Sequence, residues 1–263
     1  GIVDPGSFFY CVGVRPLLGS GRCSLPTRRS GIPSSSSHAL IGGMIGATIA
    51  KAGVDPLVMK GIVRTVSFIF ISPVLGMMLG GLIMVAVSWI CLRSAPRRVD
   101  GWFRRLQLAS SAAYSIGHGS NDAQKTMGII WLLLISAGVT STDAAMPPNW
   151  VIVSCYVAIA LGTMVGGWRI VKTMGQKITK LRPVGGFAAE TGGAITLFMA
   201  SSLGIPVSTT HTITGAIVGV GSAQRVRAVR WGLAGNIVIA WIVTMPAAAI
   251  MAAFAYYLGR LVL

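Results

Sequence analysis

The run GIPVSTTHTITGAIVG spans residues 204–219, and a near copy, GIPSSSSHALIGGMIG, spans residues 31–46. Glycine, isoleucine, proline, serine and histidine recur at matching places, as do two further glycines near the end of each run. The offset that superimposes the two runs also places Pro73 on Pro246. Agreement over such a length indicates an internal repeat, which predicts two copies of one supersecondary unit.

The composition places this repeat in a membrane protein. Of the 263 residues, 53% are hydrophobic and 11% are charged, whereas soluble domains carry about 25% charged residues. The net charge of +16 arises from Lys and Arg in blocks between apolar stretches, as in cytoplasmic loops. The blocks form no basic stripe interleaved with aromatics, so we expect the lipid bilayer and no nucleic acid as a partner. The four cysteines are scattered without a CxxC pair, which favours unpaired thiols and no zinc site.

Three apolar segments are long enough to cross a bilayer, namely 66–92, 150–168 and 231–259. Other apolar stretches are shorter and are interrupted by Gly, Pro and polar residues, as at 119–122 and 204–211. Irregular backbone at membrane depth must be buried in protein or line a cavity. The pattern therefore predicts an all-α integral membrane protein with discontinuous helices and re-entrant hairpins.

The distribution of charge predicts the topology. The basic segments 93–105 and 169–182 should be cytoplasmic, and the segment 140–149, without Lys or Arg, should lie outside. The two Gly-Ile-Pro runs then enter from opposite sides, as in an inverted-repeat secondary transporter. We expect a multi-pass protein of a bacterial inner (plasma) membrane. The expected domain order is an atypical N-terminal segment at 1–30, the remainder of the first repeat at 31–92, the cytoplasmic basic loop at 93–105 and the second repeat at 106–263.

The first repeat is predicted to be incomplete in this chain. The repeat offset carries Asn121-Asp122 to positions before residue 1, so that pair has no counterpart here. Residues 1–30 also lack the apolar pattern of 174–203, which they should match. We therefore expect the DNA upstream to encode a second Asn-Asp-like motif.

The polar residues at the breaks suit an oxyanion. A helix is predicted to begin after each break, near Ser37, Asp122 and Thr210, with Asp122 as the cap of a helix over 123–139. A helix N-terminus carries about half a positive charge and unpaired N–H groups, and it therefore favours anions. Hydroxyl groups and an amide would donate the remaining hydrogen bonds. The predicted substrate-binding residues are Asn121, Asp122, Ser36, Ser37, Thr209 and Thr210.

Asp122 and Glu190 are the acids inside apolar segments, where a carboxylate is expensive and functional by default. Carrying negative charge into a negative-inside cell costs about 2.3 kcal/mol per charge per 100 mV, so an anion needs an accompanying cation. We assign cation coupling to Asp122 and Glu190. Lys125, one turn on, could instead form a structural i,i+3 pair with Asp122, and Glu190 could be a cap or a helix contact. His38 and His211 could relay protons or bond the backbone.

The stretch HGSNDAQKTMG at residues 118–128 resembles the signature of the inorganic phosphate transporter (PiT) family. The runs at 204–219 and 31–46 look like the hairpins of the second and first repeats of that family. The resemblance implies import of inorganic phosphate with a proton or sodium through an inverted-repeat, elevator-like fold. It also implies that the six substrate-binding residues contact phosphate and that Asp122 contacts the cation. Members of the family carry a further GANDxAN-like motif near the start, and this chain has none.

Three alternatives use the same segments. They are a truncated membrane remnant without transport, a permease for sulfate or another oxyanion, and an anion channel. The GxND block at 119–122 also occurs in a family of serine hydrolases, but no Asp-x-x-His follows it and it lies in an apolar crossing, so we expect no enzyme. We expect no cofactor beyond the co-transported proton or sodium. The only metal that we expect could bind is sodium, at Asp122. The chain could also associate into homo-oligomers.

Overall fold

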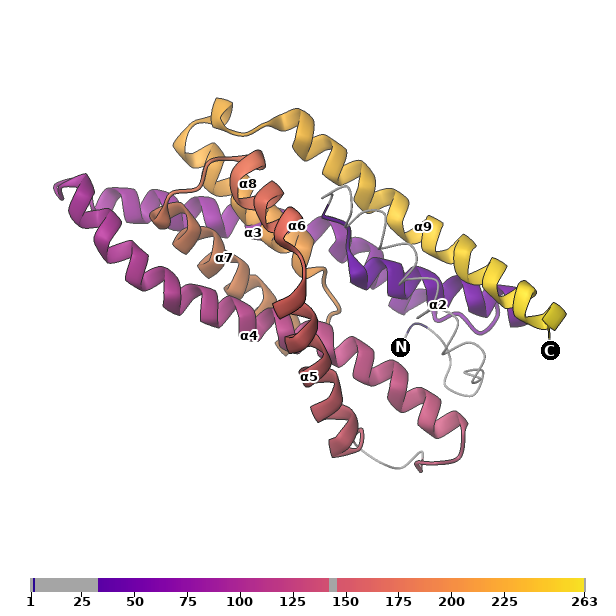
Figure 1. The fold of residues 1–263 in the computed structure, drawn as a ribbon. Helices are drawn as coiled ribbons and strands as arrows, with labels where there is room; N and C mark the ends of the chain where they lie inside the picture. Colours follow the sequence, from indigo (N-terminus) through magenta and orange to yellow (C-terminus); the bar gives the residue numbers. More distant parts are fainter. Residues whose placement is uncertain (1, 3–32, 142–145, 263) are drawn as a thin grey trace. The chain divides into compact units, whose positions relative to one another are not determined.

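A computed structural model describes residues 2, 33–141 and 146–262, and the backbone of these residues is helical without a strand (Figure 1). The predicted N-terminal segment 1–30 lies outside the described residues, apart from residue 2. The prediction of an all-α protein is confirmed. The elements in chain order are α2 (Ser36–Ala52), α3 (Met59–Ile90), α4 (Pro96–Ser136), α5 (Asn149–Val165), α6 (Trp168–Lys172), the π-helical turn η2 (Thr173–Ile178), α7 (Pro183–Ser202), α8 (Thr209–Gln224), the 3-10 turn η3 (Val226–Ala228) and α9 (Trp231–Val262).

Two of the described helices are long and apolar enough to cross a membrane. They are Met59–Ile90 and Trp231–Leu258, each with a mean hydropathy of 2.3. They confirm two of the spans that the sequence predicted. A third span results if α5 and the helical turns over Trp168–Ile178 are counted as one bent crossing. Large apolar side chains such as Leu82 and Phe254 are exposed on the two long helices, as expected for surfaces that face lipid.

Helix α4 corrects one of the sequence predictions. The sequence predicted a break at 119–122 and a new helix with Asp122 as its cap, but α4 is continuous from Pro96 to Ser136. Inside a helix the backbone N–H groups are bonded to carbonyls one turn earlier, so the chain needs no side-chain cap here. The side chains of Asn121 and Asp122 make other hydrogen bonds. Asp122 is therefore an interior residue of α4 and marks no helix N-terminus.

The basic segments are more helical than the sequence predicted. The segment 93–105 was expected to be a loop, but α4 begins at Pro96, where a proline is favourable because a first-turn N–H has no helical partner anyway. The segment 169–182 contains α6 and η2. The side of the membrane on which these segments lie stays a prediction.

The chain forms two compact units that interleave along the sequence. Unit 1 contains residues 1–65, 122–167 and 239–263, and unit 2 contains residues 66–121 and 168–238. Helices α3, α4 and α9 contribute residues to both units. Each unit thus combines parts of both sequence repeats.

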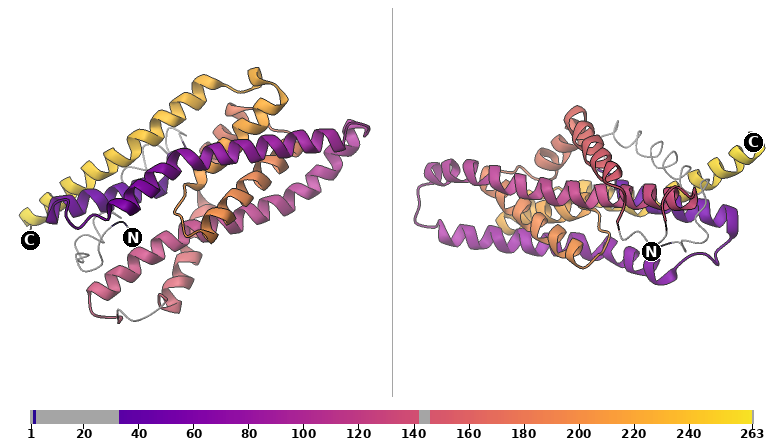
Figure 2. Two further views of the ribbon diagram at one scale, coloured as in Figure 1. Left: turned by 180° about the vertical axis from the view of Figure 1, so that it is seen from behind. Right: turned by 90° about the horizontal axis from the view of Figure 1, so that it is seen from below.

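In unit 1, α2 lies beside the C-terminal half of α9 (Figures 1 and 2). Gly42 and Gly46 form the contact face of α2, because a Cβ at either position would collide with the backbone of Met245 or Ala249. Small residues allow two helix backbones to approach this closely. The contact explains why α2 carries glycines at this spacing.

Unit 2 uses the same packing between different helices. Helices α7 and α8 lie side by side as a hairpin, joined by residues 203–208, which confirms the predicted hairpin (Figure 1). Gly215 and Gly219 of α8 lie directly against the backbone of α3 at Pro73 and Met77. These glycines occupy the repeat positions of the contact glycines in α2. The inverted orientation of the two repeats and the re-entrant character of the hairpin stay predictions.

Candidate functional site

The helices that follow the two Gly-Ile-Pro runs are capped in the same way. The N-cap of α2 is Ser35, whose Oγ accepts a hydrogen bond from the backbone N–H of His38 at 3.2 Å. The N-cap of α8 is Ser208, whose Oγ accepts from the backbone N–H of His211 at 3.3 Å. The predicted helix starts near Ser37 and Thr210 are thus confirmed, and each is capped by a serine. Such starts favour a nearby anion, because their first N–H groups lack helical partners.

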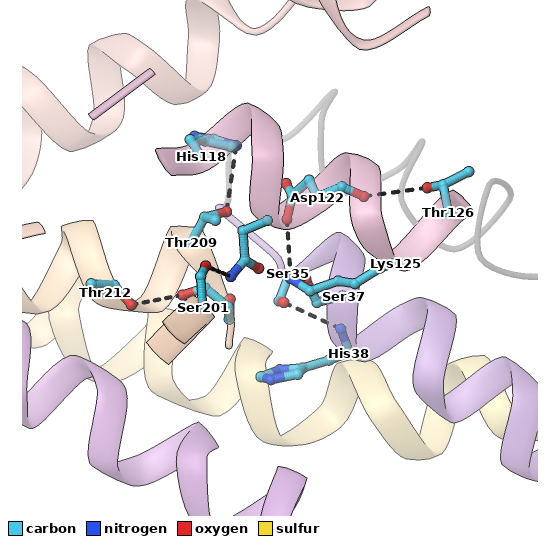
Figure 3. A network of polar contacts seen from close by, with 12 residues as sticks. Ser35, Ser37, His38, His118, Asp122, Lys125, Thr126, Ser201, Thr209 and Thr212 are labelled. Carbon is cyan, nitrogen blue, oxygen red and sulfur yellow. Dashed lines mark hydrogen bonds and ion pairs between the residues drawn. The ribbon is translucent and has the colours of Figure 1, made fainter. Parts of the chain in front are cut away.

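In unit 1, an ion pair lies at the start of α2 (Figure 3). Lys125 Nζ of α4 donates to Ser37 Oγ at 2.7 Å and to Asp122 Oδ1 at 3.1 Å. The side chains of Lys125 and Asp122 are 12% and 19% exposed. The i,i+3 pair that the sequence offered as an alternative is therefore present. In these apolar surroundings each charge offsets much of the cost of burying the other.

The chain leading into α2 is fixed to α9 within the same unit. The indole Nε1 of Trp241 donates to the carbonyl oxygen of Pro33 at 3.1 Å. Ser36, the first residue of α2, is exposed, whereas Ser37 is buried against Lys125. The two predicted serines thus differ in their surroundings, and only the second has a charged partner.

In unit 2, two side chains of α4 contact Thr209, the first residue of α8. Figure 3 shows one of them, His118. The hydroxyl of Tyr114 donates to the backbone carbonyl of Thr209 at 3.1 Å. Nε2 of His118 lies 3.4 Å from Thr209 Oγ1. The rings of Tyr114 and His118 pack edge to face, with centroids 5.7 Å apart. These contacts fix the first turn of α8, where Thr210 follows half-buried.

Asn121 makes a contact that the sequence did not predict. Its Nδ2 donates to Ser201 Oγ of α7 at 3.3 Å, and the side chain is 4% exposed. Its amide oxygen has no hydrogen-bond partner among the described residues. A buried acceptor without a partner costs free energy, so a ligand that donates to Asn121 Oδ1 would be stabilised there.

Glu190 of α7 is held by neutral groups. Its carboxylate accepts from Ser110 Oγ at 2.6 Å and from Gln107 Nε2 at 3.4 Å, both on α4. The helix contact that the sequence left open for Glu190 is therefore present. Its coupling role stays a proposal.

The predicted site residues divide between the two units. Asp122 lies with Ser36 and Ser37 in unit 1, and the remaining predicted residues, Asn121, Thr209, Thr210 and Glu190, lie in unit 2. The described residues contain no group of three or more His, Cys, Asp or Glu that could hold a metal ion.

Sequence reasoning missed the residues that hold the site. It named no role for Tyr114 or Ser201 and gave Lys125 only as an alternative. A signal existed in the helical period, because Tyr114, His118 and Asp122 follow one another at intervals of four residues, and such residues share one face of a helix. No comparable signal pointed to Ser201.

The comparisons with known proteins agree on one family. The model described as "Phosphate transporter family" matches residues 1–99 and 93–252. This match includes residues 1–30, which the sequence analysis set apart from the likeness. A probable low-affinity inorganic phosphate transporter of Rhizobium meliloti is 57% identical over 262 residues, which cover 100% of this chain and 78% of that protein. A protein of the same name from Mycobacterium tuberculosis is 44% identical, and the match covers 91% of this chain and 58% of the relative. The chain is thus shorter than these relatives.

Among solved structures, one described as "The sodium-dependent phosphate transporter" is similar to this chain with a TM-score of 0.88. The match covers 100% of this chain and 84% of that structure at 24% sequence identity. At this identity the likeness concerns the fold alone. It agrees with the helical membrane architecture that the sequence predicted.

Proposed function

The chain belongs to the phosphate transporter family, and we propose that it carries inorganic phosphate across a membrane together with a cation, either a proton or sodium. The observation that carries the proposal is the family match over nearly the whole chain. The names of the relatives support phosphate as the substrate. The name of the similar structure supports a cation as the co-substrate. We place the protein as a multi-pass protein of a bacterial inner membrane.

We assign phosphate contacts to the polar residues at the two capped helix starts and at Asn121. The hydroxyl groups are neutral donors, and each helix start adds a partial positive charge without a buried arginine. Groups of this kind bind an oxyanion reversibly, as a transporter requires. The assigned residues are Ser36, Ser37, Asn121, Asp122, Thr209 and Thr210.

We assign the cation to two half-buried acids, Asp122 and Glu190. A carboxylate and a phosphate are both negative, and they repel each other in apolar surroundings. Phosphate therefore needs a cation to accompany it past these acids. The unpartnered oxygen of Asn121 supports the same chemistry. It can accept a hydrogen bond from a protonated phosphate or lie against a cation.

The proposal is tested by uptake of labelled phosphate into proteoliposomes that contain this chain. We expect uptake that rises with an inward proton or sodium gradient. Inserted protein without uptake would indicate a non-transporting remnant, and uptake that ignores every cation gradient would indicate a channel. Strong competition by sulfate would indicate a broader oxyanion permease.

The variant Asp122→Asn tests the site assignment in the same assay, because it removes a charge with little change in volume. We expect coupled uptake to be lost while insertion into the membrane persists. Asp55→Asn is the matched control, since Asp55 is exposed, and its uptake should be unchanged. Phosphate uptake by the Asp122→Asn variant with an unaltered cation dependence would contradict the assignment of Asp122 to the site.

A further inference from the structure

Lys125 is a largely buried lysine within α4, with a side chain 12% exposed, well away from the basic blocks of the chain. Burying an ammonium group at membrane depth is costly, and residues of this kind usually serve a function. The family assignment leaves Lys125 without a role. It donates to two residues to which the proposed function gives a role, Asp122 and Ser37.

We propose that the Lys125 ammonium is a built-in counter-cation that takes the position beside Asp122 and Ser37 where a free monovalent cation would otherwise bind. Asp122 then does not bind sodium as long as the lysine is present, so of the two acids to which the proposed function assigns the cation only Glu190 is open to sodium. This inference rests on the proposed function for its meaning, because it concerns which cation accompanies phosphate. It names Lys125 as the residue that determines cation selectivity in unit 1.

The geometry supports the substitution of one cation by another. A carboxylate oxygen and a hydroxyl oxygen converge on one nitrogen, at 3.1 Å and 2.7 Å. Oxygen atoms of these kinds are also the ligands that hard metal cations prefer. The lysine nitrogen occupies the point where the two oxygens converge (Figure 3). A sodium ion placed there would meet a second positive charge, which a site of low polarity disfavours.

The lysine also has an advantage over an ion in solution because it is tethered. Lys125 and Asp122 lie one turn apart on the same helix, so the ammonium is present at a high effective concentration. Its contact with Ser37 joins α4 to the first turn of α2. A free cation would have to displace both contacts.

Glu190 provides the contrast within the same chain. Its hydrogen-bond donors are the hydroxyl of Ser110 and the amide of Gln107, which carry no charge. Neutral donors leave the charge of a carboxylate in place, whereas an ammonium cancels it. The two half-buried acids therefore differ in their capacity to attract a cation from solution.

The test measures the melting temperature of the purified full chain in detergent, in sodium chloride and in choline chloride at equal ionic strength. A ligand that binds only the folded state raises the melting temperature. We expect no sodium-specific shift that depends on Asp122 in the unsubstituted protein, so Asp122→Asn should leave its response to sodium unchanged. Lys125→Met should show a saturable sodium-specific rise of several degrees, and Lys125→Met combined with Asp122→Asn should lose it.

Two further variants control the charge. Lys125→Arg keeps a cation beside Asp122 and should stay insensitive to sodium. Lys180→Met removes an exposed lysine that lies outside the two Gly-Ile-Pro runs and the helices that follow them, and this variant should also stay insensitive to sodium. If Lys125→Met fails to fold, Lys125→Gln carries the same expectation, because its amide can still donate to Ser37.

Two results would overturn the inference. One is a sodium-specific rise in the unsubstituted protein that Asp122→Asn removes. The other is the absence of a sodium-specific rise in both Lys125→Met and Lys125→Gln. Phosphate uptake is a separate measurement, so a sodium response confined to the lysine variants in a protein that transports no phosphate would sustain this inference while the proposed function fails.

Discussion

The starts of α2 and α8 have the same backbone and are held by different chemistry. Each is capped by a serine, with φ of −90° at Ser35 and −87° at Ser208. Each of the two helices also lies against the backbone of a long helix through two glycines. At α2 the adjoining contact comes from the ammonium of Lys125, whereas at α8 it comes from the imidazole of His118 and the phenol of Tyr114. The repeat thus keeps capping and packing and changes the electrostatics of the hydroxyl groups.

The glycine packing that α2 and α8 share should give the largest loss of stability when it is disturbed. Gly46→Leu and Gly219→Leu place a side chain directly against helix backbone, which cannot move aside as a side chain can. We expect each to cost roughly 3 kcal/mol or more of stability, seen as loss of the folded peak in size-exclusion chromatography. Gly128→Leu is the control, because a Cβ there meets no atom within 4 Å, and it should fold. If only one of the two contact variants unfolds, the packing of α2 and α8 is not equivalent.

The difference in charge predicts unequal losses at the two hydroxyl groups. Ser37→Ala removes an acceptor from an ammonium, which should cost about 1.5–3 kcal/mol, whereas Thr209→Val removes a neutral contact worth about 0.5–1.5 kcal/mol. Chemical denaturation of the two variants measures the difference. Ser111→Ala, at a half-buried serine of α4 whose hydroxyl bonds the carbonyl of Leu108 in its own helix, should change stability by less than either. Equal losses of unfolding free energy in Ser37→Ala and Thr209→Val would mean that the charge of Lys125 does not strengthen its contact with α2.

The contacts that His118 and Tyr114 make with Thr209 at the start of α8 can be tested by phosphate uptake. His118→Ala removes the contact with Thr209 Oγ1 without touching its backbone, and one hydrogen bond of about 1 kcal/mol corresponds to a roughly fivefold fall in uptake. Tyr114→Phe keeps the ring and removes the bond to the Thr209 carbonyl, so it should have a similar or smaller effect. Initial rates of phosphate uptake measure both. Unchanged uptake in both variants would show that the position of Thr209 does not depend on α4.

The caps should give the smallest effects and the closest agreement. Ser35→Ala and Ser208→Ala each remove one bond to a histidine N–H, at an expected cost of about 1 kcal/mol. Thermal unfolding should place the two variants close together. Ser35→Asn and Ser208→Asn should restore most of the loss, because asparagine is an equally good cap. Losses that differ by more than the cost of one cap would separate the two helix starts.

Local signals in the sequence predicted the helix starts well. Proline, serine and histidine recur at fixed spacing in the two runs, and capping depends on residues within one turn. The long apolar segments likewise predicted α3 and α9, because spanning depends on length and hydropathy alone.

Contacts between distant residues could not be predicted in the same way. Gly119 and Asp122 carry local signals for a helix break, but α4 is continuous, since the polar side chains beside them have partners along the helix and on α7. The repeat predicted two copies of one supersecondary unit but not the helices that each copy contacts. The structure pairs α2 with α9 and α8 with α3 through their glycine faces. The sequence pattern within one helix does not indicate which other helix will pack against it.

The pairing of α2 with α9 has a consequence for how the chain is made. When a ribosome has synthesised α8, its partner α3 is already in place, so the contacts of Gly215 and Gly219 can form at once. Helix α2 emerges before α9, yet Met245 and Ala249, which cover its glycines, belong to α9, which follows every other described helix in the chain. Until α9 is synthesised the backbone of α2 along Gly42 and Gly46 has no cover from it. The α2–α9 contact of unit 1 can therefore form only after α9 has been made, whereas the α3–α8 contact of unit 2 is available earlier.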